Sequence, residues 1–540
     1  MNNARWAYDG GTTLPNLTDE INKRRTFAII SHPDAGKTTL TEKFLLYGGA
    51  IALAGSVKGK KTARHAVSDW MEIEKQRGIS VTSSVLQFSY GGCCINILDT
   101  PGHQDFSEDT YRTLMAADSA VMVIDASKGV EAQTRKLFKV CVMRQIPIFT
   151  FINKMDRDAR DPYELLEEIE GELGIATYPM TWPVGSGKEF KGVYDRTAKK
   201  MISFTANNGQ REVEATALSL DDPALDGLIG KDFADALRGD VELLDGASAD
   251  FDLEAVQAGR LSPVFFGSAL TNFGVEPFLK DFLRLTPPPL PRQCEEGQVD
   301  PFDPDFSAFV FKIQANMNKA HRDRIAFLRI CSGRFDKNME VLHVQGDKKM
   351  RLLQPQQMMA QEREVIDEAY AGDIIGVFDP GIFSIGDTIC TPSHKVRFAG
   401  IPTFAPEHFA RVRQIDTLKR KQFVKGTSQI AQEGAIQIFR EPGKGMEEVI
   451  VGVVGTLQFD VLEYRLKNEY GVDIRLEMLS YQHLRWIEET PVEPKKLKIT
   501  SDTRVVQDFK DNYLLLFTDS WNINWALEKN EGLKLAEFSR

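Results

Sequence analysis

The sequence predicts an α/β domain, followed by a β-barrel and then by an α+β domain. In the first part of the chain, several short apolar runs each end in a cluster of Gly, Asp, Asn or Thr, which is typical of buried parallel strands with polar carboxyl ends. Further along, short apolar runs alternate with Gly-Asp turns, which is typical of antiparallel strands. We therefore expect domains at residues 1–290, 300–395 and 396–540.

Length and composition are those of a globular protein with several cores. A chain of 540 residues exceeds what one core supports, and about 100–200 residues per domain gives three or four domains. No run reaches ~18 consecutive apolar residues, and the N-terminus lacks the apolar stretch of a signal peptide. The six cysteines are scattered without metal-binding spacing. We expect reduced thiols, no membrane span and a cytoplasmic location.

Charge is unevenly distributed along the chain. The net charge of −11 argues against a protein that coats nucleic acid with its whole surface. Residues 394–425, however, contain eight basic and two acidic side chains. This stretch is either a solvated basic face or a patch that contacts RNA phosphates.

A phosphate-binding loop follows the apolar run at residues 27–30. Residues 39–46 after the loop form a helical pattern, and strand–loop–helix is the context that a P-loop requires. Lys37 would reach the β- and γ-phosphates, and the Thr38 hydroxyl would bind Mg²⁺. Ser31 replaces the first glycine of the G-x-x-x-x-G-K-[ST] pattern. The candidate loop residues are Ser31, His32, Pro33, Asp34, Ala35, Gly36, Lys37, Thr38 and Thr39.

A second polar cluster follows the apolar run at residues 95–98. Asp99 is placed to hold Mg²⁺, usually through water, and the Gly102 N–H could reach the γ-phosphate because glycine permits close backbone approach. A lone D-x-x-G pattern is a weak indication of nucleotide binding. Its position after a strand and downstream of a P-loop makes the indication stronger. The candidates here are Asp99, Thr100, Pro101, Gly102 and His103.

An N-K-x-D element after the run at residues 146–152 indicates which base is bound. The Asp156 carboxylate can accept from both the ring N–H and the exocyclic amine of guanine, a pair that adenine does not offer. The Lys154 stem can cover the ring, and the Asn153 amide can brace the P-loop. The candidate guanine-binding residues are Asn153, Lys154, Met155 and Asp156.

Two further elements complete a GTP-binding set. Ser268 and Ala269 follow the apolar run at residues 264–266, and a backbone N–H there would contact the guanine carbonyl oxygen. A hydroxyl at Ser80 could ligate Mg²⁺ only when the γ-phosphate is present, which would make residues 69–80 an order–disorder switch. The alternative for this segment is a charged surface helix followed by a turn. We expect GTP or GDP and Mg²⁺ as ligands, with the metal held by Thr38, Ser80 and Asp99.

Residues 34–39, 77–80, 99–103 and 153–156 resemble the motifs of the translational GTPases. In that superfamily a histidine follows D-T-P-G, and the resemblance implies that His103 is catalytic and orients the attacking water when the ribosome pushes it inward. The alternative is that His103 is merely an exposed loop residue.

Residues 31–34 resemble the bacterial class II release factors, the GTPases called release factor three. Elongation factors usually have glycine where Ser31 stands and valine where Pro33 stands. The resemblance continues at 371–377 and 386–389 in the β-barrel and between 422 and 460 in the third domain, so it covers most of the chain.

The stretch between the guanine-binding elements is longer than one helix and one strand require. We expect an insertion at about 160–260, with helices near 163–173 and 227–244. Asn208-Gly209 indicates a hairpin turn. The prolines of residues 286–291 mark a stiff linker after the first domain.

The resemblance implies a ribosome-dependent GTPase of translation termination that promotes dissociation of class I release factors and is itself a monomer. One alternative is an elongation factor G-like translocase or a ribosomal-protection GTPase, which carries two more domains than the chain to Arg540 accommodates. Another is a GTP-dependent assembly factor that does not hydrolyse its nucleotide, against which His103 argues.

Overall fold

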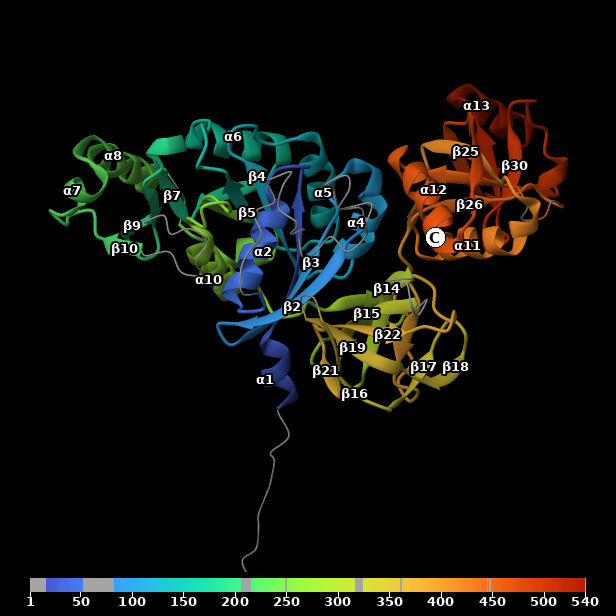
Figure 1. Ribbon diagram of the computed structural model, residues 1–540, viewed down its shortest axis with the longest axis horizontal. Coiled ribbons are helices and arrows are strands. Elements are labelled where there is room, and N and C mark those ends of the chain that lie inside the picture. Colours follow the sequence, from blue (N-terminus) through green and yellow to red (C-terminus); the bar gives the residue numbers. More distant parts are fainter. Residues whose placement is uncertain are drawn as a thin grey trace, which may run out of the picture.

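The computed structural model describes residues 16–51, 82–204, 215–247, 250–315, 324–359, 362–443, 445 and 448–539. These form three parts (Figure 1): an α/β part, a β-barrel part below it and a C-terminal part that lies beside helix α4 and above strand β14. The α/β part and the β-barrel part are those of the predicted fold, and the C-terminal part combines helices and sheets as expected.

The α/β part is built on a seven-stranded sheet with the order β2-β3-β1-β4-β5-β11-β6. All neighbouring strands are parallel except the antiparallel pair β2 and β3. Strand order reverses beside β1, because β3 and β4 lie on opposite sides of it, and ligands of such sheets bind at the carboxyl ends near this point. The strands are β1 (Arg24–Ser31), β2 (Ser84–Tyr90), β3 (Cys93–Asp99), β4 (Ser119–Asp125), β5 (Ile148–Asn153), β6 (Ala176–Pro179) and β11 (Leu261–Phe266).

Helices cover both faces of this sheet, and the four apolar runs named above lie in its buried strands β1, β3, β5 and β11. On one face Phe44 and Phe282 pack against Phe27 of β1. On the other face Leu137 and Phe138 belong to a second cluster. The covering helices are α2 (Lys37–Tyr47), α4 (Ser107–Leu114), α5 (Ala132–Met143), α6 (Pro162–Leu173) and α10 (Val275–Leu285), and a 3₁₀ turn η1 (Gln104–Phe106) precedes α4.

The expected insertion at about 160–260 stays a prediction; α6 and β6 belong to the main layers, and the elements between β6 and β11 lie at one end of the α/β part (Figure 1). They include an antiparallel sheet of β7 (Thr181–Val184), β8 (Gly192–Asp195), β9 (Lys200–Phe204) and β10 (Ala215–Leu218), and the helices α7 (Leu225–Ile229), α8 (Lys231–Ala247) and α9 (Leu253–Gln257). The two predicted helical segments are thus confirmed by α6 and by α7 with α8. The predicted turn at Asn208-Gly209 lies outside the described residues, although β9 and β10 on either side pair antiparallel.

The β-barrel part is an eight-stranded antiparallel sheet with the order β18-β17-β23-β14-β15-β22-β19-β20. It encloses a core that includes Val310, Leu328 and Ile375. The strands are β14 (Ser307–Ala315), β15 (Arg324–Ser332), β17 (Glu340–His343), β18 (Lys348–Arg351), β19 (Leu353–Met359), β20 (Glu362–Val365), β22 (Ile374–Phe378) and β23 (Thr388–Cys390), with a separate pair β16 (Arg334–Asp336) and β21 (Glu368–Tyr370).

The C-terminal part contains two four-stranded sheets, β26-β27-β25-β28 and β30-β31-β29-β32, where the sequence predicted a single α+β unit. The first sheet is buried on both faces: Val412 points to the core under α11 and α12, and Phe409 to the core shared with Trp486 of the second sheet. Its elements are β25 (His408–Gln414), α11 (Arg420–Gln432), β26 (Gln437–Phe439), β27 (Glu448–Val453), α12 (Leu457–Tyr470) and β28 (Ile474–Leu479). The second comprises β29 (His483–Glu489), β30 (Arg504–Gln507), β31 (Tyr513–Phe517), α13 (Ser520–Lys529) and β32 (Lys534–Ala536).

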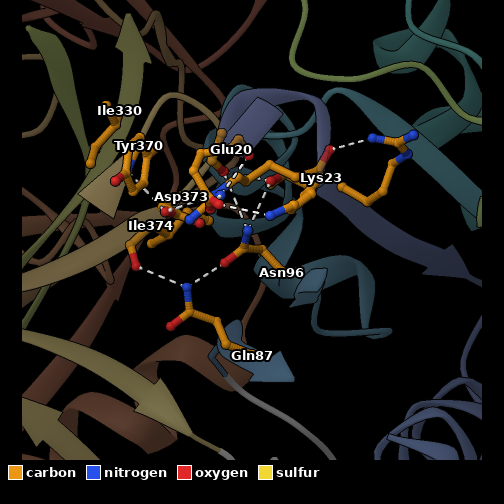
Figure 2. A network of polar contacts seen from close by, with 12 residues as sticks. Glu20, Lys23, Gln87, Asn96, Ile330, Tyr370, Asp373 and Ile374 are labelled. Atoms are coloured by element: carbon orange, nitrogen blue, oxygen red, sulfur yellow. Dashed lines mark hydrogen bonds and ion pairs between the residues drawn. The ribbon is translucent and has the colours of Figure 1, made fainter. Parts of the chain in front are cut away.

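A buried polar network joins the α/β part to the β-barrel part. Figure 2 shows Gln87 and Asn96 beside Asp373 and Ile374, and the Gln87 amide donates to the Ile374 carbonyl at 3.2 Å. Several acceptors in this network are backbone carbonyls, so its geometry depends on the path of the backbone in both parts. Other buried contacts across the interface join Arg24 to Asp373, Thr26 and Asn96 to the Gly372 carbonyl, and Arg329 to Asp118 and to the Ala116 carbonyl.

None of the helices in the described ranges is both long and apolar enough to span a bilayer. All six cysteines lie in described segments and are free thiols. Burial raises the pKa of the Cys141 thiol to about 12, which keeps it protonated at neutral pH, as expected of a structural thiol.

Candidate functional site

A cavity of about 530 Å³ lies at the carboxyl ends of the central strands, at the point where the strand order reverses. Its volume is within the range of pockets for small ligands, about 300–1,000 Å³. Most residues predicted from the sequence line it: Ser31, His32, Pro33, Asp34, Gly36, Lys37, Thr38, Thr39, Gly102, His103, Asn153, Lys154, Asp156 and Ala269.

The loop between β1 and α2 has the conformation of a phosphate cradle. Gly36 stands immediately before α2 with φ of 98°, a left-handed conformation that favours glycine. A Cβ atom there would lie 2.2 Å from Nδ2 of Asn153. The backbone can therefore approach the guanine-binding element closely only with glycine at this position, and the first turn of α2 directs its free N–H groups into the cavity.

The phosphate end of the cavity brings a cation and a carboxylate together. Lys37 Nζ lies 2.5 Å from Oδ1 of Asp99, and both side chains are buried. Ser31 Oγ is buried without a hydrogen-bond partner in the described part of the chain. The Lys37 ammonium, the Asp99 carboxylate and the Thr38 hydroxyl in the first turn of α2 are the groups that a Mg²⁺–triphosphate requires, so these residues fit the predicted ligand.

Asn153, in the predicted guanine-binding element, braces the loop between β1 and α2 as predicted. Asn153 Nδ2 donates to the Ala35 carbonyl at 2.8 Å, and Asn153 Oδ1 accepts from the Ala269 N–H at 2.8 Å. One amide therefore joins three loops that are far apart in the sequence.

Asp156 lies beside Ser268, whose hydroxyl donates to Oδ1 of Asp156 at 2.6 Å. The Ser268 N–H itself donates to the Phe273 carbonyl, and the Ala269 N–H is held by Asn153. A guanine carbonyl would have to displace one of these contacts to use either N–H group as predicted.

Six predicted residues are buried and do not themselves line the cavity: Ala35, Asp99, Thr100, Pro101, Met155 and Ser268. Thr100 Oγ1 donates to the Ile29 carbonyl and so ties the end of β3 to β1. The predicted metal ligand Ser80 and the rest of the switch segment lie outside the described residues.

The sequence assigned no role to Asp125, Ser127, Lys128, Arg157 or Leu270, which also line the cavity. Lys154 Nζ lies 2.5 Å from Oδ2 of Asp125. Burial raises the pKa of Asp125, but hydrogen bonds from Lys154 and Ser127 outweigh it and the net shift is downward. Asp125 therefore orients the lysine stem that would cover the base. Asp125 ends the apolar run of β4, and this position at a strand end is the feature of the sequence that could have indicated a role for it.

His103 lies on the cavity wall next to Gly102, and 35% of its side chain is exposed. Its Nδ1 atom lies 3.1 Å from Oδ1 of Asp105 and 3.3 Å from the Asp105 backbone nitrogen. Nε2 is thus the ring nitrogen left for a group in the cavity.

The basic stretch at 394–425 is divided among several elements in the structure. It runs through β25 into the first half of α11, and two of its cations are paired, Arg411 with Glu448 at 3.2 Å and Lys395 with Asp347 at 3.4 Å. Contact of this stretch with RNA stays a prediction.

Family models match three successive segments of the chain. Residues 22–288 match the elongation factor Tu GTP binding domain, and residues 305–392 match elongation factor G domain 2. Residues 398–527 match the C-terminal domain of class II release factor RF3.

Curated relatives match almost the whole chain. Peptide chain release factor 3 from Symbiobacterium thermophilum is 59% identical over 521 residues, which are 96% of this chain and 98% of that protein. This chain belongs to the peptide chain release factor 3 family. Peptide chain release factor 3 from Cyanothece sp. is 52% identical and covers 96% of both chains. The matched GTP binding domain and the family of the curated relatives confirm the predicted family resemblance, the predicted fold class and the predicted GTPase activity.

A crystal structure of a protein from Thermus thermophilus has a TM-score of 0.68, and the match covers 90% of this chain and 72% of that one. Its sequence identity is 23%, so it supports the fold alone. The α/β part and the β-barrel part of this release factor 3 family member therefore have the architecture predicted from the motifs.

Proposed function

We propose that this chain is a GTPase of translation termination whose hydrolysis is stimulated by the ribosome and which promotes release of class I release factors. One observation carries the proposal. A single cavity collects Lys37 for the phosphates, Asp156 for guanine and His103 for a water. The family to which the chain belongs supports the termination role. The ribosome and class I release factors are the proposed partners, and the cytoplasm is the proposed location of a monomeric factor.

The residues act by positioning and by neutralising charge. Loop N–H groups and Lys37 bind the triphosphate, while Asp156 accepts two hydrogen bonds from guanine. Thr38 and Asp99 would hold Mg²⁺, with Ser80 from the switch segment, and the bound ion would neutralise charge on the β- and γ-oxygens. His103 holds the attacking water through Nε2. Hydrolysis is slow until the ribosome fixes this arrangement, and we expect stimulation of about 10³–10⁵-fold.

Steady-state GTP hydrolysis with and without ribosomes tests this function, followed by an assay of class I release-factor dissociation. We expect little hydrolysis without ribosomes, strong hydrolysis with them, and dissociation that requires GTP. Turnover that is equally fast without ribosomes would contradict the proposal. A factor that binds GTP without hydrolysing it would be the assembly factor considered above. Translocation of tRNA without release-factor dissociation would favour the elongation factor G alternative.

Replacing His103 tests the assigned chemistry. In His103→Ala the water loses its partner, so ribosome-stimulated hydrolysis falls by about 10²–10⁴-fold. GTP affinity, measured by titration of a fluorescent analogue, stays near that of the parent protein. A large loss of affinity with unchanged turnover would show that His103 binds nucleotide and does not act on the water.

A further inference from the structure

Asp105 contacts two parts of the molecule at once. It is buried in η1, two residues after His103. One carboxylate oxygen, Oδ1, lies 3.1 Å from Nδ1 of His103, and the other, Oδ2, accepts from the N–H of Leu457 at 2.9 Å. Leu457 is the first residue of α12 in the C-terminal part, 352 positions further along the chain.

We propose that Asp105 is a positioning residue that couples the orientation of His103 to the docking of α12. The inference rests on the role of His103 in the proposed function and extends it to the C-terminal part.

The start of α12 has a free donor that Asp105 satisfies. The first N–H groups of a helix have no partner within the helix, and the residue at the cap of α12, Thr456, offers no side-chain hydrogen bond. The carboxylate of Asp105 takes that place from a different domain, where the partial positive charge of the helix also favours it.

Gly455 leaves room for this contact. A Cβ atom at Gly455 would lie 2.0 Å from Cγ of Asp105, so any side chain there must displace the carboxylate. The contact therefore requires a side-chain oxygen acceptor at 105 and a glycine at 455.

Neighbouring contacts fix the distance between the two elements. Phe106 packs with Val461 of α12 in a small buried apolar cluster. Arg112 of α4 donates to the Gly434 carbonyl, just after α11, at 2.8 Å. If the C-terminal part moved away, Asp105 would lose its donor together with these contacts, and it would no longer be held beside His103.

The Asp105 carboxylate affects which ring nitrogen of His103 carries the proton. Two groups of Asp105 face Nδ1: its N–H, which favours a lone pair on that nitrogen, and its carboxylate, which favours a proton there. The charged carboxylate is the stronger partner, so we expect it to favour the tautomer with the proton on Nδ1, which leaves the lone pair of Nε2 for a water in the cavity. An amide at 105 could still accept from Leu457 through its oxygen, but its NH₂ group would face Nδ1 and favour the opposite tautomer.

Two variants on opposite sides of the interface test the coupling. Asp105→Asn keeps an acceptor for α12 and changes the group at Nδ1, so we expect a fall of about 10²-fold or more in the ribosome-stimulated kcat, with normal GTP affinity and normal hydrogen-exchange protection of α12. Gly455→Ala displaces an unchanged carboxylate, so we expect a fall in kcat together with faster exchange at the start of α12. Since both act on one contact, the kcat of the double variant should be about equal to that of the more impaired single variant.

Asp519→Asn is the matched control. Asp519 caps α13 in the same C-terminal part by accepting from the Asn522 N–H at 2.9 Å, so this variant alters a capping carboxylate away from the nucleotide cavity. We expect its kcat to equal that of the parent protein.

The outcomes separate this inference from the proposed function. If His103→Ala loses stimulated hydrolysis while Asp105→Asn and Gly455→Ala hydrolyse GTP as fast as the parent or faster, the coupling is wrong and the function stands. Additive losses in the double variant would also overturn the coupling. If His103→Ala itself hydrolyses normally, the role of His103 fails and this inference fails with it.

Discussion

Charged and polar side chains of the nucleotide cavity are paired with one another. Lys37 pairs with Asp99, Lys154 with Asp125, and the Ser268 hydroxyl donates to Asp156. Such pairs avoid the cost of leaving a buried polar group unsatisfied, and they keep each side chain close to the place where its ligand atom would be bound. Nucleotide binding therefore exchanges existing contacts for new ones, and the affinity depends on the difference.

Asp156→Asn should change base preference. The amide NH₂ cannot accept from the guanine ring N–H and amine, so GTP affinity should fall by about 10–100-fold, the effect of losing charge-assisted hydrogen bonds. The same NH₂ can donate to the C2 oxygen of xanthine, so the affinity for xanthosine triphosphate should rise. Competition titrations with both nucleotides measure the shift.

Ser268→Ala is the control for that substitution. It removes the hydroxyl beside Asp156 and leaves the acceptor set for guanine intact, so the preference for GTP should remain. A loss in Asp156→Asn that is equal for both nucleotides would indicate a structural defect and contradict the role of Asp156 as the guanine acceptor.

The sequence predicted those residues that belong to contiguous motifs at strand ends. Most lie on the cavity wall because parallel strands bring their carboxyl ends to one edge. It missed Lys128 and Asp125, which lie near a strand end but in no recognisable motif. It also missed the role of Asp105, because the partner of that carboxylate, Leu457, is brought near only by the packing of two domains.

At the scale of elements, helix α4 connects all three parts. Its Asp109 accepts from the N–H and the hydroxyl of Ser83, each at 2.7 Å. Lys312 of β14 in the β-barrel donates to the Ser83 hydroxyl at 3.0 Å. Arg112 on the same helix contacts the C-terminal part. Ser83 lies at the start of a described range, three positions after the predicted switch segment, and is held by the β-barrel and by α4 together.

Lys312→Met should loosen this junction. It leaves the Ser83 carbonyl and Asp109 with one buried partner fewer, which costs about 1–3 kcal/mol. We expect a thermal unfolding midpoint lower by several degrees, measured by calorimetry, because this protein has several domains and no single free energy of unfolding describes it. Lys348→Met, which changes an exposed lysine of β18, should leave the midpoint unchanged. Equal shifts in the two variants would contradict a specific role of Lys312.

Secondary structure was predictable where local pattern and tertiary burial agree. The helix at Pro162–Leu173 has a capping Asp161 and an apolar face, and its existence was expected. The division of the C-terminal part into two sheets was not, because β25 mixes apolar and basic residues, and Phe409, which packs toward the second sheet, does not by itself reveal a second layer.

For the whole molecule, the acid response depends on the buried carboxylate Asp109, whose charge stabilises the folded state. Burial raises the pKa of Asp109, but Lys312, Arg112 and the hydrogen bonds from Ser83 outweigh it, and the net pKa lies below the ordinary value. A lowered pKa means that the folded state favours the charged form. Its contribution is present above about pH 4 and is lost as pH falls through the lowered value.

Asp109→Asn should therefore flatten the acid dependence of stability. In the parent protein the thermal midpoint should decrease as pH falls below about 4, and part of this slope should be absent in the variant. Asp300→Asn, which changes an exposed aspartate, should keep the parental slope. An unchanged slope in Asp109→Asn would show that Asp109 does not contribute to the acid response.

The network of Figure 2 has a consequence for the exchange of domains between relatives. Side chains of the α/β part donate to main-chain oxygens of the β-barrel at Gly372 and Ile374, and Arg329 of the barrel donates in return to the carbonyl of Ala116. A chimera that joins this α/β part to the barrel of a distant GTPase would bury these donors opposite a differently placed backbone. We therefore expect the two parts to be exchanged successfully only as one unit.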